Sequence, residues 1–307
     1  MKKVYLNAIK IIISIILLTF VIVKVGLEEI IGTFLSMDLK YIPLILVIYF
    51  ISVILGAFNI YLLLKKINVK LNFLIILKYH LLSWSVGLFM PGKIGEFSII
   101  YLLRKEGIHY GKGFAIAFLD KFITLFTLLL FSFIGFIVFF GIDYGFYILL
   151  AILTLILLAF ILTSSFGSKI IKFIFRKYSS YFEVFRDTFK EFFIKHKMNL
   201  FINFLITILK WFLASIVVLF IFFSFGYSAN IFLITLISMS LIIINLVPIT
   251  FHGLGLKELA AVYLYGLIGI PGEISVATYL IFTIIAYLLG VILMLSFGHF
   301  FFKKTSL

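Results

Sequence analysis

Two charged motifs broken by glycine are the parts of this chain best suited to chemistry. The first, from Pro91 to Glu96, reads Pro-Gly-Lys-Ile-Gly-Glu, and the second, from Pro248 to Glu258, reads Pro-Ile-Thr-Phe-His-Gly-Leu-Gly-Leu-Lys-Glu. Both follow long apolar stretches. A charge near the centre of a bilayer costs about 3 kcal/mol even on lenient insertion scales, so such charges indicate function. Broken apolar segments at matching places in two halves of a chain indicate the substrate site of a transporter.

The residue types in both motifs favour binding of an anion. Proline and glycine end one helix and let the backbone approach a ligand. The helix that restarts presents free N–H groups and the positive end of its dipole, and Lys93 or Lys257 adds a full charge there. A phosphate fits both places. The predicted structural breaks are Pro91, Gly92 and Gly95 in the first motif and Pro248, Gly253 and Gly255 in the second.

Each motif also carries a glutamate beside its lysine. Glu96 follows Lys93 at i+3, on one face of a helix, so the two can pair when the site is empty. Lys257 and Glu258 are neighbours that point about 100° apart on a helix, which lets one face a cavity and the other a neighbouring helix. The alternative interpretation is that these are structural ion pairs that pin the breaks, and pinning and binding can use the same residues.

Further charges and one histidine lie at membrane depth. We expect Asp120 and Lys121 to line the same cavity. Lys210 either lines it or extends toward the cytoplasmic side, because long basic side chains can carry their charge to the interface. His252 either binds a headgroup or bonds carbonyls of its turn. The histidines show no metal-ligand spacing and the chain has no cysteine, so we expect no metal site.

Composition places the chain in a membrane as a single all-α domain, residues 1–307. It is 64% hydrophobic, and its 40 phenylalanines exceed what a water-soluble core could hide. The net charge of +14 lies in short loops between apolar segments. Retention of those loops on the cytoplasmic side explains them better than nucleic acid binding does, and we expect no nucleic-acid partner.

Hydropathy predicts helices in eight apolar segments. Eight plain spans are one possible topology, but they place the most basic loop, 167–199, outside, against the positive-inside rule. If 71–106 and 230–268 are instead re-entrant hairpins, that loop, the other basic loops and both termini lie in the cytoplasm. We therefore predict six full transmembrane helices and two hairpins. The segments lie near 4–23, 41–64, 71–90, 113–140, 146–166, 199–225, 230–247 and 275–302.

The six-span topology predicts an inverted repeat. Residues 1–145 form the first repeat and 146–307 the second, upside down relative to the first. One hairpin then enters from the cytoplasm and the other from outside, and they meet near the midplane, as in many transporters. Irregular backbone at that depth requires burial in protein or a wet cavity.

These motifs resemble the lysylphosphatidylglycerol synthase transmembrane family, also described as flippase-like integral membrane proteins. The resemblance covers nearly the whole chain, and in that family the basic residue of the first motif is often Arg rather than Lys. It is carried by Pro91, Lys93, Gly95, Glu96, Arg104, Asp120, Lys121, Pro248, Gly253, Leu254, Gly255 and Glu258.

The resemblance implies a function in lipid transport. Better-understood members carry a soluble aminoacyltransferase domain that makes lysylphosphatidylglycerol, while the membrane part moves the lipid between leaflets. Residues 1–307 contain no such domain, so the resemblance does not imply aminoacyl transfer. Archaeal relatives occur near glycosylation functions, which would suit a sugar linked to polyprenyl phosphate.

We therefore expect a flippase-like lipid translocase of the cell membrane, without a cofactor, that moves an anionic phospholipid or polyprenyl-phosphate lipid through a polar cavity at the midplane. The alternatives are an intramembrane transferase acting on a lipid carrier and a secondary transporter of a soluble anion. No convincing catalytic motif supports an enzyme. The expected substrate-binding residues are Lys93, Glu96, Arg104, Asp120, Lys121, Lys210, His252, Lys257 and Glu258.

Overall fold

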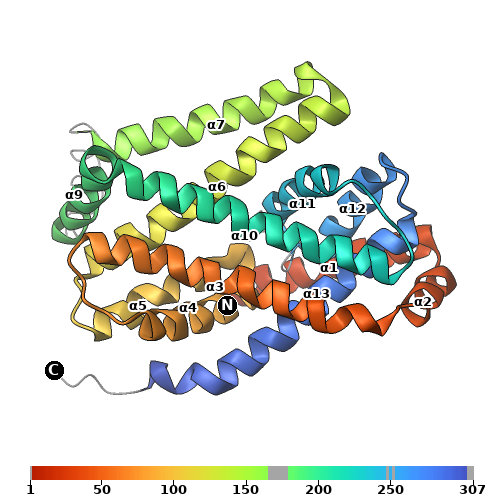
Figure 1. The fold of residues 1–307 in the computed structure, drawn as a ribbon, viewed down its shortest axis with the longest axis horizontal. Helices are drawn as coiled ribbons and strands as arrows, with labels where there is room; N and C mark the ends of the chain where they lie inside the picture. The colour runs from red at the N-terminus through yellow and green to blue at the C-terminus, as the bar shows by residue number, and fades with distance from the viewer. Residues whose placement is uncertain (1, 165–178, 247–248, 251–252, 303–307) are drawn as a thin grey trace.

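The computed structural model describes residues 2–164, 179–246, 249–250 and 253–302, and every regular element in these ranges is a helix (Figure 1). The calls on Pro248 and His252 therefore lie outside the described residues. The long elements are α1 (Lys2–Val25), α3 (Ile42–Lys66), α6 (Tyr110–Phe140), α7 (Ile142–Thr163), α10 (Lys197–Ser224) and α13 (Gly272–Phe297). The shorter ones are α2 (Leu27–Leu35), η1 (Leu39–Tyr41), α4 (Phe73–Leu88), η2 (Pro91–Ser98), α5 (Ile99–Lys105), α9 (Ser179–Lys195), α11 (Ile231–Leu246), α12 (Leu256–Gly266) and η5 (Gly298–Phe301).

Five of the described helices are long and apolar enough to cross a membrane, and α1 with α2 adds a sixth span if that bent pair counts as one. The pair bends by 83° at Gly26, whose φ of 104° suits glycine. The chain is thus a multi-pass α-helical membrane protein, as predicted. The re-entrant hairpins and the inverted repeat stay predictions.

The helices around the two motifs are too short to span. α4 and α11 have 16 residues each, about 24 Å, whereas the hydrocarbon core is about 30 Å thick. Glycine lets the chain fold back tightly after α4: a Cβ on Gly95 would lie 2.5 Å from the Val86 carbonyl oxygen. After α11, Gly253 and Gly255 adopt φ values of 71° and 81°.

Packing relates the two halves of the chain in a matched way. α3 lies against α10, α4 packs against α13, and α11 packs against α6. Each short helix therefore contacts the long helix that follows the other short helix. Figure 1 shows α4 and α5 toward one end of the long axis and α11 and α12 toward the other.

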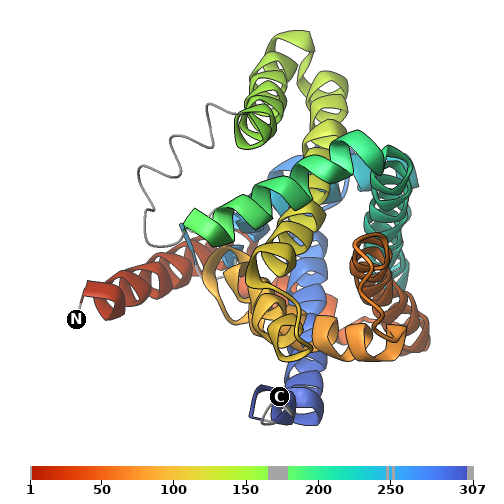
Figure 2. The ribbon, with the colours of Figure 1, turned by 90° about the vertical axis from the view of Figure 1, so that its left-hand side faces the viewer.

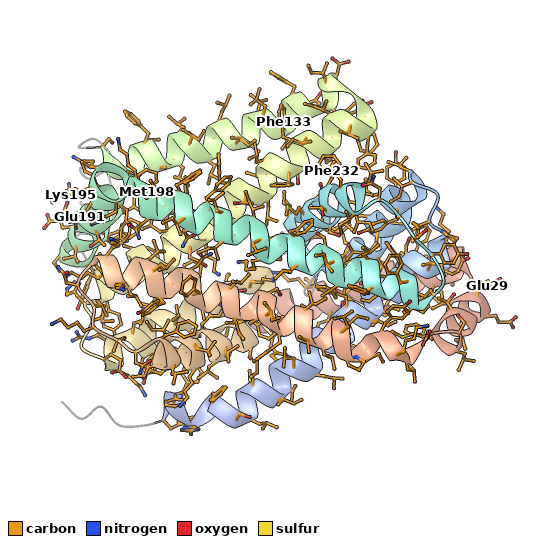
Figure 3. All side chains as sticks on the ribbon, viewed as in Figure 1. Glu29, Phe133, Glu191, Lys195, Met198 and Phe232 are labelled. Atoms are coloured by element: carbon orange, nitrogen blue, oxygen red, sulfur yellow. The ribbon has the colours of Figure 1, made fainter. Side chains whose placement is uncertain are left out.

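Charge differs between the two ends of the bundle. Helices α3, α5 and α9 end in lysine or arginine at the end where the chain terminates (Figure 1). At the opposite end, α2, α7 and α13 begin with acidic residues. Figure 3 labels Glu191 and Lys195 at the basic end and Glu29 at the other. Positive charge gathered at one end is typical of a protein that sorts its loops across a membrane.

An amphipathic helix, α9, lies across the basic end (Figure 2). Three of its phenylalanines, Phe185, Phe189 and Phe192, are buried in the same core cluster as Ile116 and Leu119 of α6. The described part of the 167–199 loop is therefore docked to the bundle. It packs against the start of α6, where the rings of His109 and Tyr110 both contact Tyr181.

Candidate functional site

One cavity of about 330 Å³ lies where the two breaks approach each other. Helices α3, α4, α6, α10, α11, α12 and α13 and the turn η2 all contribute lining side chains. Four of the predicted site lysines line it, together with Glu96. The lining lysines are Lys93, Lys121, Lys210 and Lys257. Lys93 and Lys257 thus line the same cavity although they are more than 160 positions apart in the sequence.

Lys93 reaches the cavity from an unusual backbone conformation. It has a φ of 56° and follows Gly92 with a φ of 61°, so two consecutive residues are left-handed. For a residue with a Cβ this conformation costs about 1–2 kcal/mol. Strain of this kind concentrates at functional sites, where the surrounding structure holds it in place. Here the surrounding structure is α4, against which η2 packs.

Lys93 and Lys210 are the two cavity lysines without a carboxylate partner among the described residues. Their ammonium groups contact the same indole: Lys93 Nζ lies 5.8 Å and Lys210 Nζ 4.8 Å from the centroid of Trp211. Cation–π contacts of this length are attractive but leave hydrogen-bond donors unused. Lys210 therefore lines the cavity, the first of the two placements predicted for it.

Trp211 and two other lining side chains add unused polar atoms. Trp211 Nε1, Thr124 Oγ1 and Asn245 Oδ1 are buried and have no hydrogen-bond partner among the described residues. Buried polar atoms are rarely left unpaired, and such atoms call for an explanation such as a ligand or water. Together with Lys93 and Lys210 they form a set dominated by donors, which suits an anion.

Lys121 neutralises carboxylates instead of standing free. Its ammonium forms ion pairs with Glu96 and with Asp120, the latter at 3.0 Å from Oδ2. Asp120 is 1% exposed and stands behind Lys121, so only the lysine lines the cavity. Glu96 therefore pairs with Lys121 of α6, and the structure shows no pair between Glu96 and Lys93. The expected pairing was wrong because the turn η2 is irregular at Lys93 and does not keep helical spacing.

Lys257 is almost completely enclosed. Its Nζ lies 3.3 Å from Oε1 of Glu258 and donates to Thr283 Oγ1 of α13 at 2.6 Å. Glu258 is fully buried, and its Oε2 accepts the backbone N–H of Gly255 at 2.7 Å. The carboxylate thus caps the start of α12 and occupies a backbone donor that was expected to be free for a ligand. Of the two neighbours, Lys257 lines the cavity and Glu258 does not, although their side chains also form an ion pair.

Arg104 does not join the cavity. It is exposed in the last turn of α5, where its guanidinium lies 5.3 Å from the ring centroid of Tyr110. Of the predicted breaks, Pro91 begins η2, and Gly92 lines the cavity. Gly255 lies against α1, since a Cβ there would be 2.7 Å from the backbone nitrogen of Leu18.

Sequence reasoning did not find the aromatic and neutral polar part of the lining. It includes both tryptophans of the chain, Trp84 and Trp211. His80 lines the cavity where α4 meets α3, above Gly56, which has no side chain to block it. The position of Trp211 directly after Lys210 was the one available signal. The other aromatic and neutral polar lining residues are Tyr49, Ser52, Thr124, Ser238, Asn245, Tyr279 and Thr283.

Comparison with known proteins identifies a family. The family model for the lysylphosphatidylglycerol synthase TM region matches residues 7–293. That range contains every residue that lines the cavity. No curated protein matches the chain.

Proposed function

Because the chain belongs to the lysylphosphatidylglycerol synthase transmembrane family, we propose that it is a membrane lipid translocase that moves a phosphate-bearing headgroup between leaflets. The headgroup crosses through the central cavity while the acyl or prenyl tails stay in the surrounding lipid. The observation that carries the proposal is the convergence of four lysines from η2, α6, α10 and α12 on one cavity. Basic residues at membrane depth are expensive and mark pathways for charged substrates.

The topology that we propose is an inverted repeat with two re-entrant hairpins. The first hairpin is α4 with η2 and α5, and the second is α11 with α12. Three observations support it: the short helices cannot span, they lie toward opposite ends of the bundle, and α4–α13 packing has its counterpart in α11–α6 packing. We infer that the basic end is cytoplasmic, that both termini face the cytoplasm, and that the membrane is the cell membrane.

The state of the carboxylates favours translocation over chemistry. An intramembrane transferase would need a base, for which Glu96, Asp120 and Glu258 are the candidates. Each of them is already bound by a lysine ammonium. A substrate that used one of these carboxylates as a base would have to disrupt its ion pair with the lysine.

The direct test is translocation in liposomes. The purified protein is reconstituted with lipids that carry a fluorophore on the acyl chain, and dithionite reduces the fluorophores of the outer leaflet. We expect anionic or polyprenyl-phosphate lipids to equilibrate between leaflets faster than in empty liposomes. Lys93→Gln should slow this exchange, whereas Lys78→Gln, which removes a charge outside the cavity, should leave it unchanged. Equal rates with and without protein would contradict the proposal.

Cysteine labelling tests the topology, because the chain has no cysteine of its own. Single cysteines replace His109 and Glu191 at the basic end and Tyr144 at the other, and intact cells are treated with an impermeant maleimide. Labelling at position 144 alone is expected. Labelling at 109 and 191 with position 144 protected would support eight plain spans.

Product formation by the protein in detergent, where no leaflets exist, would instead favour the transferase. Uptake of a labelled water-soluble anion into sealed vesicles would favour a secondary transporter.

A further inference from the structure

The charges around the cavity also indicate the net charge of its ligand. Four lysines line the cavity, and three carboxylates lie in it or directly behind it. The lysines are Lys93, Lys121, Lys210 and Lys257, and the carboxylates are Glu96, Asp120 and Glu258. With all seven ionised, the described part of the site has one positive charge in excess.

These charges form three separate groups. Lys257 and Glu258 neutralise each other. Lys121 serves two carboxylates, Glu96 and Asp120, so this cluster has one negative charge in excess. The remaining two positive charges belong to Lys93 and Lys210, on one indole ring. The positive excess is therefore located at Trp211 and not spread over the cavity.

A loaded site at membrane depth favours overall neutrality, because an uncompensated charge away from water is costly. A headgroup with one net negative charge neutralises this cavity. A headgroup with two negative charges leaves one in excess, and a zwitterionic or cationic headgroup leaves the positive excess in place or increases it.

We propose that the cavity selects lipids whose headgroup is a phosphodiester with a single net negative charge, and that the phosphate lies between Lys93 and Lys210 against Trp211. A phosphodiester has two non-bridging oxygens that share its charge, so each can accept from one ammonium. The indole N–H and the Thr124 hydroxyl, neither of which has a partner among the described residues, are further donors in the cavity lining. This assignment makes Lys210 and Trp211 determinants of specificity and rests on the proposed function of the cavity as the path of a lipid headgroup.

The assignment also separates the roles of the lysines. Lys93 and Lys210 bind the ligand, whereas Lys121 and Lys257 hold carboxylates. A diphosphate-linked lipid and an aminoacylated, cationic lipid are both excluded as preferred cargo. A sugar linked through one phosphate and an unmodified phosphatidylglycerol both remain, since each has one negative charge.

The experiment shifts the charge of the site by one unit in each direction. Translocation is measured for three lipids with identical labelled acyl chains at pH 7: phosphatidylcholine (neutral), phosphatidylglycerol (one negative charge) and phosphatidic acid (more than one negative charge). The variants are Lys210→Gln, which lowers the charge of the site by one, and Glu96→Gln, which raises it by one. Lys78→Gln serves as the control, because Lys78 lies over the Phe300 ring and outside the cavity.

The native protein and the control should prefer phosphatidylglycerol by about tenfold or more, since a close unpaired charge is worth several kcal/mol at a partly buried site. Lys210→Gln should move the preference to phosphatidylcholine, and Glu96→Gln should move it to phosphatidic acid. An unchanged order of the three lipids in both variants would overturn the proposal, as would equal rates for all three lipids in the native protein.

Binding separates this inference from the proposed function. Both tryptophans of the chain line the cavity, so their fluorescence in detergent reports ligand binding without any leaflet. The same lipids, and inorganic phosphate as a soluble anion, are titrated against the native protein and the variants. Charge-ordered binding without translocation would support the inference and contradict the translocase, whereas translocation with no order in charge would do the reverse. Binding of inorganic phosphate as tight as that of phosphatidylglycerol would show that the site is not selective for a lipid diester, and this would overturn the inference.

Discussion

The two breaks have similar residues, yet they leave their lysines in opposite states. At the first break, Lys93 projects from a left-handed turn and has no carboxylate partner among the described residues, because Glu96 pairs with Lys121 of α6. At the second break, Lys257 has a side chain that is 4% exposed, and Glu258 and Thr283 hold it. The first break thus keeps its cation available, and the second neutralises it.

The backbone explains the difference. The second break resumes as a regular helix at Leu256, so the side chain of Glu258 can return to the free N–H of Gly255 and stay beside Lys257. The first break continues as the irregular turn η2, which directs Glu96 toward α6. Similar motifs in two halves of a chain therefore do not imply equal roles in binding.

The largest expected effect comes from the second break, where Glu258 neutralises Lys257. Glu258→Gln should destabilise the protein by about 3–5 kcal/mol, because it leaves the Lys257 ammonium buried with no carboxylate. Glu96→Gln should cost much less, since Lys121 keeps Asp120 and its side chain is 30% exposed. Thermal unfolding of the purified variants in detergent measures both.

Glu28→Gln is the matched control for this pair, because Glu28 is exposed at the start of α2. It should change stability by no more than about 1 kcal/mol. Equal losses of stability in Glu258→Gln and Glu96→Gln would show that the two breaks do not differ in how firmly they bind their lysines.

A medium effect is expected where the first hairpin folds back on itself. In Gly95→Ala the new Cβ would lie 2.5 Å from the carbonyl oxygen of Val86 and 2.8 Å from the nitrogen of Gly87, both backbone atoms that cannot move independently. The turn η2 must shift away from α4, at a cost of about 1–3 kcal/mol. Because Lys93 lies on that turn, translocation should fall as well.

Gly32→Ala provides the comparison for that variant. Gly32 lies inside α2, and a Cβ there would meet no atom within 4 Å. Alanine is the better helix former by about 1 kcal/mol, so this variant should be neutral or slightly more stable. A Gly95→Ala protein as stable and as active as Gly32→Ala would show that the tight turn does not position Lys93.

Much of the fold could be predicted from the sequence, because lipid imposes simple rules on it. A spanning helix must be long, apolar and internally hydrogen-bonded, so hydropathy located α3, α6, α7, α10 and α13 within a few residues. Charge in the loops then favoured six spans over eight. The repeat at residues 1–145 and 146–307 stays a prediction.

The site was predicted less completely than the fold, for a physical reason. Charged residues at membrane depth are rare and costly, so Lys93, Lys121, Lys210 and Lys257 could be identified. Which carboxylate each lysine contacts depends on packing between distant helices, such as η2 with α6. Aromatic residues are common throughout this chain, so nothing in the sequence distinguished Trp211 from a residue that faces lipid.

The smallest expected effect is the release of backbone strain at Lys93. The same substitution at the second break should change stability in the opposite direction. Asparagine tolerates the left-handed conformation better than lysine does. Lys93→Asn should therefore be as stable as the native protein or up to about 1 kcal/mol more stable, while it loses affinity for phosphatidylglycerol. The same substitution at Lys257 lies in a regular helix and leaves Glu258 buried without its cation, so it should destabilise strongly.

Unfolding temperature and tryptophan fluorescence are measured on both variants. A Lys93→Asn protein that unfolds as readily as Lys257→Asn would show that Lys93 is a structural residue, whereas a stable variant that no longer binds the lipid would show that the fold holds this lysine in a strained conformation for its ligand.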